Sequence, residues 1–348
     1  MATPEPISMN SSDDLPKIAN RFGVDGRRLF HTVLLLATTI PLLSLPVLAA
    51  FDEPFGNSLL MGLAILIGGV GHVASTASIY SDRAARKIMA PHPLRFRLVP
   101  LAAITFTAAS LAWGGSVVIS TNIVAAFFIV HLLWLHYHYQ KQNYGLVAFA
   151  GASSGVRIPQ TLVYALLMPA LSGCLIMMPT LVGGALPEVQ FLGPLQNTLR
   201  SAGEIIYGLG LVMLIMVIAN RAEVFQRPLV ALYTLTSFGF FLPALLIQHP
   251  EYAFWSYAIA HGFQYLIMVP LLITGARMQI GKVIAFLACV IAGGLFLHKL
   301  AGNHALFLCG IFLTWVHFVL DAKLWRMSEP AQRNLIRERF AYLFANTK

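Results

Sequence analysis

Charged residues are scarce in this chain. Only 11% of its 348 residues are Asp, Glu, Lys or Arg, whereas 57% are hydrophobic, and the mean hydropathy is +0.73. A soluble domain carries about 25% charged residues, because its surface must stay hydrated. The composition therefore excludes a soluble globular protein and predicts one whose surface faces lipid.

Cysteine is also scarce, and the familiar metal-binding motifs are absent. Cys174, Cys289 and Cys309 lie inside apolar runs and form no CxxC pair, so we expect buried thiols rather than a disulfide or a metal site. The sequence contains neither the HxxxH and HxxHH motifs of membrane desaturases nor the HExxH motif of zinc peptidases. No motif therefore points to a particular family of metalloenzymes.

What the sequence does contain is a series of apolar stretches about 20 residues long, the length that crosses roughly 30 Å of hydrocarbon. We expect ten spans, at approximately 29–50, 57–80, 98–116, 117–139, 158–182, 201–220, 229–248, 252–274, 281–299 and 303–325. Only Gly114 and Gly115 separate the third from the fourth. The predicted fold is all-α, a polytopic transmembrane helix bundle over 29–325, with a tail over 1–28 and a basic segment over 326–348.

Basic residues are distributed unevenly around these spans. If residues 1–28 are cytoplasmic and every stretch crosses, the cytoplasmic side receives all 23 Lys and Arg except Arg200 and Lys299. The positive-inside rule then predicts that both termini are cytoplasmic. We expect a multi-pass protein of the bacterial inner (cytoplasmic) membrane. This distribution explains the net charge of +9 without a nucleic-acid partner, and the lipid bilayer is the expected partner.

The C-terminal segment SEPAQRNLIRERFAYLF has a helical apolar period. Leu335, Ile336, Phe340 and Leu343 recur at helical spacing between basic residues. This pattern predicts a basic amphipathic helix on the anionic inner leaflet, with a solvated helical tail as the alternative.

Histidine is the polar residue that the spans themselves contain. Ionisable side chains at membrane depth are costly, and their default interpretation is functional. Among the eleven histidines, several lie between mid-membrane and the cytoplasmic boundary of spans two, four, eight and ten: His72, His131, His138, His261 and His317. Because these four spans run in the same direction, their inner halves can meet in one layer.

The spacing of histidines within one helix separates candidate ligands from other residues. At ~100° per residue, His131 and His138 lie about 20° apart on one face, whereas His136 points away from both by roughly 140–160°. We therefore expect His136, and also His31 at the start of the first span, to be hydrogen-bonding residues between helices.

Two polar side chains accompany these histidines at helical spacing. Asp321 follows His317 by four residues, so its carboxylate could bind a metal or fix the tautomer of His317. Gln264 follows His261 by three residues, and Gly262 between them allows close helix approach. We expect both Asp321 and Gln264 to contribute to the site.

Imidazole and carboxylate ligands together suit iron, zinc, copper or nickel. The sequence therefore predicts an integral membrane metalloenzyme, in which non-haem iron bound by histidine oxidises a lipophilic substrate at the cytoplasmic side of the bilayer, with a redox partner. The expected metal ligands are His72, His131, His138, His261 and His317, with Asp321 and Gln264 in or around the site.

Three other functions fit the same histidines. Two imidazoles on facing helices could bind a b-type haem in an electron-transfer subunit, although one haem needs fewer histidines than the sequence offers. A proton- or metal-coupled transporter would use histidines as a relay or as ligands, but the outer halves of spans two, four and ten are almost wholly apolar. In a purely structural role, the histidines would join helices by hydrogen bonds.

Overall fold

The computed structural model describes residues 26–50, 59–113, 119–275, 279–300 and 304–344, and all regular structure in these ranges is helical. Ten helices are long and apolar enough to cross a membrane: Gly26–Ala49, Met61–Ser81, Leu94–Ala112, Thr121–Ser153, Thr161–Ala185, Gly193–Asn220, Pro228–Leu246, Pro250–Thr274, Ile280–Lys299 and His304–Leu324. The prediction of an all-α chain with ten helices of membrane-spanning length and composition is confirmed. The third and fourth are separate helices, and Gly114 and Gly115 lie outside the described residues.

Several of these spans are built from more than one helical segment. In chain order the elements are α2 (Gly26–Ala50), α3 (Leu59–Ala64), η2 (Ile65–Gly71), α4 (His72–Ser75), η3 (Thr76–Ser81), α5 (Arg83–Met89), η4 (Leu94–Leu98), α6 (Val99–Ala112), α7 (Thr121–Ser153), α8 (Thr161–Ala185), η5 (Gly193–Leu195), α9 (Gln196–Asn220), α10 (Ala222–Phe225), α11 (Pro228–Phe238), η6 (Gly239–Phe241), α12 (Leu242–Leu246), α13 (Pro250–Thr274), α14 (Ile280–Lys299), α15 (His304–Leu324), α16 (Pro330–Arg339) and α17 (Ala341–Phe344). The second span is the most irregular, because it joins α3, η2, α4 and η3.

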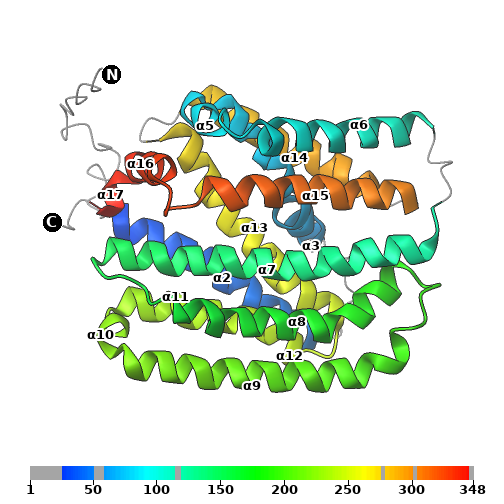
Figure 1. Ribbon diagram of the computed structural model, residues 1–348, viewed down its shortest axis with the longest axis horizontal. Coiled ribbons are helices and arrows are strands. Elements are labelled where there is room, and N and C mark those ends of the chain that lie inside the picture. The colour runs from blue at the N-terminus through cyan, green and yellow to red at the C-terminus, as the bar shows by residue number, and fades with distance from the viewer. Residues whose placement is uncertain (1–25, 51–58, 114–118, 276–278, 301–303, 345–348) are drawn as a thin grey trace.

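Several long helices, among them α7, α9 and α15, run along the long axis of the molecule, and α13 crosses its middle obliquely (Figure 1). In the most apolar window of α13, 72% of the residues are buried inside the protein, against 22% for α9 and 17% for α14. Outward residues of α9 such as Leu209 and Ile215 are exposed, as expected for helices that contact lipid. Polar side chains in the middle of α13, by contrast, are buried, as His261 and Gln264 are.

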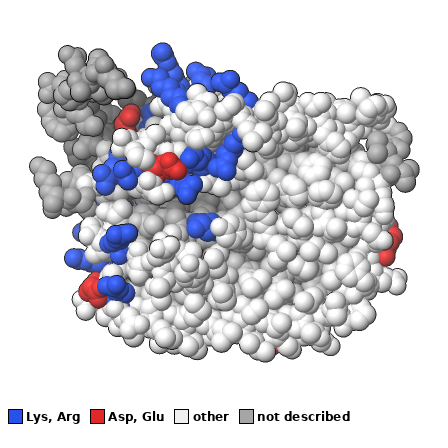
Figure 2. Space-filling model, viewed as in Figure 1, with Lys and Arg blue, Asp and Glu red and all other residues white. Residues whose placement is uncertain are grey.

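Charged residues gather at one end of the molecule. Figure 2 shows Lys and Arg concentrated at the end where α5, α16 and α17 lie, while most of the remaining surface in this view carries no charge. A largely uncharged surface beside a basic end matches the pattern of a protein embedded in a bilayer.

Helix α7 is longer than the fourth predicted span, which ended at Tyr139. It has 33 residues, about 50 Å at ~1.5 Å per residue, and continues to Ser153. The predicted span ended just before the polar residues that follow Tyr139. Gln140 and Asn143 are buried and hydrogen-bonded to each other, so the helix carries them into the protein interior.

The C-terminal helices pack against the bundle itself. Leu335, Ile336, Phe340 and Leu343 are buried in the same core cluster as Phe30 of α2. The apolar face that was expected to lie on a lipid leaflet is therefore covered by protein. This corrects the predicted placement, although the segment does form a helix over Pro330–Arg339.

An ion-pair cluster fastens this C-terminal segment. Asp82 accepts a hydrogen bond from the Ala85 amide at 2.9 Å and so caps α5. The same carboxylate lies 2.9 Å from Nζ of Lys282 and 3.3 Å from a guanidinium nitrogen of Arg339. We call Asp82, Lys282 and Arg339 the ionic latch, because they join α5, α14 and α16.

Candidate metal centre

A close crossing between the second span and α13 brings His72 and His261 together. Gly68 of η2 packs so tightly on Gly262 that a Cβ at Gly262 would collide with the Gly68 carbonyl and meet Nδ1 of His72 at 2.9 Å. His72 directly follows η2, a π-helix, and π-helical turns are rare and frequent at functional sites. The expected role of Gly262 in close helix approach is confirmed.

Four buried imidazoles from four spans form a closed arrangement. Ring centroids lie 5.0 Å apart for His72 and His261, 5.0 Å for His261 and His138, 5.0 Å for His138 and His317, and 5.3 Å for His317 and His72. Across the arrangement, His261 and His317 are 6.3 Å apart. We call His72, His138, His261 and His317 the histidine cluster. The prediction that inner halves of spans two, four, eight and ten meet in one layer is thereby supported for four of the five histidines.

Hydrogen bonds orient two of these rings. Nδ1 of His72 lies 2.6 Å from the Gly68 carbonyl oxygen. A carbonyl only accepts, so Nδ1 carries the proton and Nε2 of the neutral ring keeps its lone pair. Nδ1 of His317 lies 2.7 Å from the hydroxyl of Thr76, which in turn lies 3.0 Å from the hydroxyl of Tyr265. In both rings, therefore, the second nitrogen is left for another partner.

Four ring nitrogens in the histidine cluster have no hydrogen-bond partner among the described residues. They are Nε2 of His138, both nitrogens of His261 and Nε2 of His317. More than about 90% of buried polar groups are satisfied in proteins, and each exception costs about 1–3 kcal/mol. Potential ligand atoms of His72, His261 and His317 all lie within 4.8 Å of one another. Neutral imidazoles with converging nitrogens are a set of donors that transition metals bind.

Asp321 lies beside the histidine cluster, but its partners differ from those expected. Its Oδ1 accepts a hydrogen bond from Nε1 of Trp325 at 2.8 Å, and Tyr265 also hydrogen-bonds to it. Its Oδ2 lies 3.9 Å from Nε2 of His138, beyond hydrogen-bonding distance. The carboxylate therefore does not fix the tautomer of His317, which bonds to Thr76. Potential ligand atoms of Asp321, His138 and His317 lie within 4.8 Å of one another, so the alternative role, as a metal ligand, fits the geometry.

Gln264 is turned away from the cluster. Its Nε2 donates to Oγ1 of Thr38 and to Oδ1 of Asn143, both at 3.0 Å, and its Oε1 accepts from Gln142 at 2.8 Å. These contacts use both amide hydrogens. Gln264 therefore does not contribute to the site as expected. It belongs to a buried amide network one turn along α13 from His261, because polar side chains of α2 and α7 lie within hydrogen-bonding distance of its amide group.

His131 shares the expected face of α7 with His138 but lies outside the cluster. The ring of Phe318 stands between them, stacked 5.9 Å from His131 and 4.4 Å from His138. Nδ1 of His131 accepts a hydrogen bond from Nε1 of Trp315 at 3.2 Å. The structure therefore corrects the prediction that His131 and His138 meet at one site, since Phe318 of α15 separates them.

His136 and His31 make the interhelical hydrogen bonds that were expected of them. His136 is bonded through Nδ1 to the Leu132 carbonyl at 2.8 Å and through Nε2 to the Tyr257 hydroxyl at 3.0 Å. His31 Nδ1 lies 3.1 Å from the hydroxyl of Tyr233. Both nitrogens of His136 are thus occupied, unlike those of its neighbour His138.

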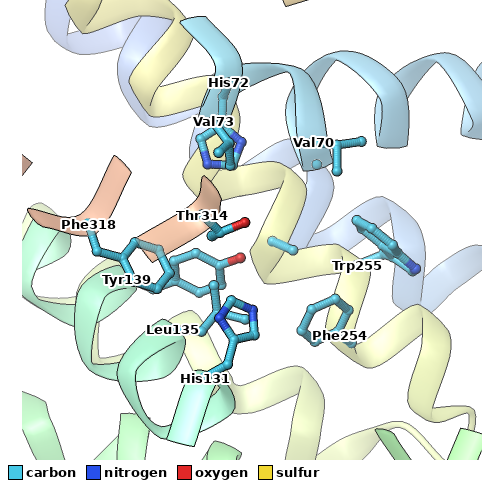
Figure 3. A pocket seen from close by; sticks show the side chains of 12 residues that line it. Val70, His72, Val73, His131, Leu135, Tyr139, Phe254, Trp255, Thr314 and Phe318 are labelled. Carbon is cyan, nitrogen blue, oxygen red and sulfur yellow. The ribbon is translucent and has the colours of Figure 1, made fainter. Parts of the chain in front are cut away.

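A cavity of about 130 Å³ adjoins the cluster (Figure 3). His72 closes it from one side and His131 from the other, and Tyr139 and Thr314 place hydroxyl groups at its wall. The remaining lining is mainly apolar: Gly69, Val70, Val73, Leu135, Phe254, Trp255, Ala258 and Phe318. The cluster is therefore next to a space suited to an apolar ligand.

Sequence reasoning missed several residues that shape this site. Thr76, Tyr265 and Trp325 hold His317 and Asp321 by hydrogen bonds, and Phe318 excludes His131. Helical spacing gave one available signal: Tyr265 and Trp325 each stand four residues after a polar residue of the predicted site, His261 and Asp321. Nothing in the sequence pattern marked Phe318.

No protein-family model, curated protein or solved structure matches this chain.

Proposed function

We propose that this chain is an integral membrane metalloenzyme in which the histidine cluster and Asp321 bind iron and a lipophilic substrate is oxidised beside it. The observation that carries the proposal is the set of four buried ring nitrogens without partners among the described residues. If the site were purely structural, nothing would compensate for the free energy lost when these nitrogens are removed from water. A metal ion would offset most of it, because each of His138, His261 and His317 can direct one lone pair to it, while the other nitrogen of His261 keeps its proton.

The residues of the site divide into two groups in this proposal. His72, His138, His261 and His317 supply neutral nitrogen donors, and Asp321 supplies the single negative charge. Thr76 and the Gly68 carbonyl hold the distal nitrogens of His317 and His72, as such partners commonly do for metal-binding imidazoles. Bound iron would supply the activation of O₂, with electrons delivered by a redox partner.

The substrate would reach the site through the apolar part of the protein. The cavity beside His72 is lined mainly by aromatic and aliphatic side chains, which favours a ligand that partitions into the bilayer. The amide network of Gln264 lies one helical turn from His261 and makes the other side of the cluster polar. Substrate binding is therefore assigned to the cavity side.

A b-type haem fits this arrangement less well. His72 and His138 stand across the cluster from each other, with His261 and His317 between them at centroid distances of 5.0–5.3 Å. A porphyrin held between any opposing pair would have to occupy the space of the other two rings. A transporter is also less favoured, because the cavity side of the cluster is mainly apolar.

The absorption spectrum and metal content of the detergent-purified protein test this proposal. We expect iron without a Soret band. A Soret band would instead identify a haem protein, and a stoichiometric amount of zinc would retain the metal site but contradict oxidation chemistry. Protein purified from iron-supplemented cells with no bound metal would contradict the metalloenzyme itself.

We further propose that both termini face the cytoplasm and that the protein resides in a bacterial inner membrane. This orientation places all Lys and Arg except Arg200 and Lys299 on the cytoplasmic side, consistent with the basic end in Figure 2. Reporters fused after residue 90, 150 or 348 should then report cytoplasm, and those after 54 or 190 the outside. A reversal at any of these sites would contradict the orientation.

A further inference from the structure

His131 has a defined tautomer even though it lies outside the histidine cluster. Its Nδ1 is 3.2 Å from Nε1 of Trp315. An indole N–H can only donate, so Nδ1 accepts, and the proton of the neutral imidazole resides on Nε2. Phe128 and Phe318 stack on the ring at interplanar angles of 18° and 9°, which fixes its plane. His131 therefore carries a hydrogen-bond donor on Nε2.

Tyr139 offers a second donor to the same cavity. Its ring packs against His261 with centroids 4.2 Å apart, and its hydroxyl is directed into the cavity in Figure 3. None of the described residues forms a hydrogen bond with this hydroxyl. A buried phenol normally finds a partner, so this hydroxyl, like the Nε2 proton of His131, is available to a ligand.

The rest of the cavity limits the kind of ligand that fits. Its volume of about 130 Å³ is close to that of an engineered cavity of ~150 Å³ that binds benzene. Leu135, Phe254 and Trp255 make much of its wall apolar. On the side opposite His131, the ring of His72 belongs to the histidine cluster. A compact apolar group bound here would thus lie between two donors and the cluster.

We propose that this cavity binds the compact end of a lipophilic substrate, a ring or short chain bearing one hydrogen-bond-accepting oxygen, and that His131 and Tyr139 donate to that oxygen. The inference rests on the proposed function for the reaction that follows binding. It makes His131 a substrate-binding residue rather than the metal ligand that the sequence predicted.

Cyclohexanone labelled with ¹³C at its carbonyl is a suitable probe, because it is a compact ring with one acceptor oxygen and no donor. Isotope-edited infrared spectra of the detergent-purified protein should show a carbonyl band at lower frequency than that of ketone dissolved in the micelle. His131→Phe should move this band back toward the frequency of ketone in the micelle and weaken binding about five- to tenfold, the typical effect of one hydrogen bond. Tyr139→Phe should reduce the shift, and His298→Phe, at an exposed position on α14, should leave it unchanged.

Metal content measured on the same samples separates this inference from the proposed function. His131→Phe that keeps its metal but shows a smaller carbonyl shift than the wild type supports the inference. If His131→Phe lost as much metal as His317→Ala, His131 would be a metal ligand and the inference would be overturned. The absence of a shifted band in the wild type would also overturn the inference. A shifted band in a wild type that binds no metal would overturn the proposed function but leave the cavity assignment standing.

Trp315→Phe provides a second variant that leaves His131 in place. Without the indole donor, both tautomers of His131 become accessible, so the shifted band should weaken while metal content stays at the wild-type level. An unchanged band in Trp315→Phe would contradict the assigned tautomer and with it the role of His131 as a donor.

Discussion

The ionic latch and the histidine cluster are both buried and polar, but they differ in how many of their polar atoms are paired: among the buried side-chain atoms of the latch, Nε of Arg339 alone has no hydrogen-bond partner within the described residues. Both oxygens of Asp82 are paired, with Lys282 at 2.9 Å, Arg339 at 3.3 Å and the Ala85 amide at 2.9 Å. The cluster leaves four ring nitrogens without partners among the described residues. The ion pairs join helices. The unpartnered ring nitrogens instead belong to two overlapping groups, one of His72, His261 and His317 and one of His138, His317 and Asp321, in each of which the potential ligand atoms lie within 4.8 Å of one another. The difference separates a structural site from a functional one within the same protein.

Removing the carboxylate of the latch should have the largest effect on stability. Asp82→Ala leaves Lys282 and Arg339 without their common partner and removes the cap of α5. Breaking a buried ion pair in this way costs about 3–5 kcal/mol, which unfolding in mixed micelles would measure. Glu204→Ala is the matched control, because its pair with Arg200 is about half exposed, at 45% and 49%, and should contribute less than about 1 kcal/mol. A similar small loss in both variants would contradict the structural role of the latch.

The carboxylate beside the cluster should instead affect metal binding. Asp321→Asn retains an acceptor for Trp325 and Tyr265 but removes the charge, so the protein should fold normally. We expect metal affinity to fall about 10–100-fold, measured by competition with a chelator. Trp325→Phe, which removes only one hydrogen bond to the carboxylate, should cause a smaller loss. Wild-type affinity in Asp321→Asn would remove this residue from the site.

Partnered and unpartnered histidines should differ most clearly in their effect on the stability of the metal-free protein. His261→Leu replaces an imidazole with two unpartnered nitrogens, so the free energy of unfolding should rise by about 1 kcal/mol in the absence of metal. His136→Leu should lower it by about 1–3 kcal/mol, because the hydroxyl of Tyr257 loses its partner. Chemical unfolding of both variants after chelation measures this difference. Equal destabilisation of the two would show that His261 has a structural role.

The pH dependence of stability should give the smallest effect, since it reports a single carboxyl group. Burial by itself would raise the pKa of Asp82, but the hydrogen bonds from Lys282 and the Ala85 amide and the charge of Arg339 outweigh it, so the pKa lies below its ordinary value. A lowered folded-state pKa means that the latch contributes fully above the unfolded value of about 3.9 and loses its contribution as the pH falls through the folded-state pKa. Thermal melting below about pH 4 should therefore depend less on pH in Asp82→Asn than in the wild type, and equal slopes would contradict this.

The sequence predicted the helices and part of the site, because both follow from local periodicity. Ten apolar stretches and the angle between His136 and His138 on one helix are properties of a single segment. The exclusion of His131 depends on Phe318 of another helix, and the amide network of Gln264 depends on Thr38 and Asn143. Packing between helices determines where these side chains lie, and the sequence pattern of a single helix does not predict that packing. The C-terminal helix was misplaced for the same reason, since its apolar face fits a leaflet and a bundle equally well.

The central claim, that unpartnered nitrogens mark a metal site, is tested most directly on two histidines of the same helix. His138 has an unpartnered Nε2, whereas both nitrogens of His136, two residues earlier, are hydrogen-bonded. Metal content per folded chain should fall at least tenfold in His138→Ala and stay at the wild-type level in His136→Ala. Equal metal content in the two variants, whether retained or lost, would contradict the account.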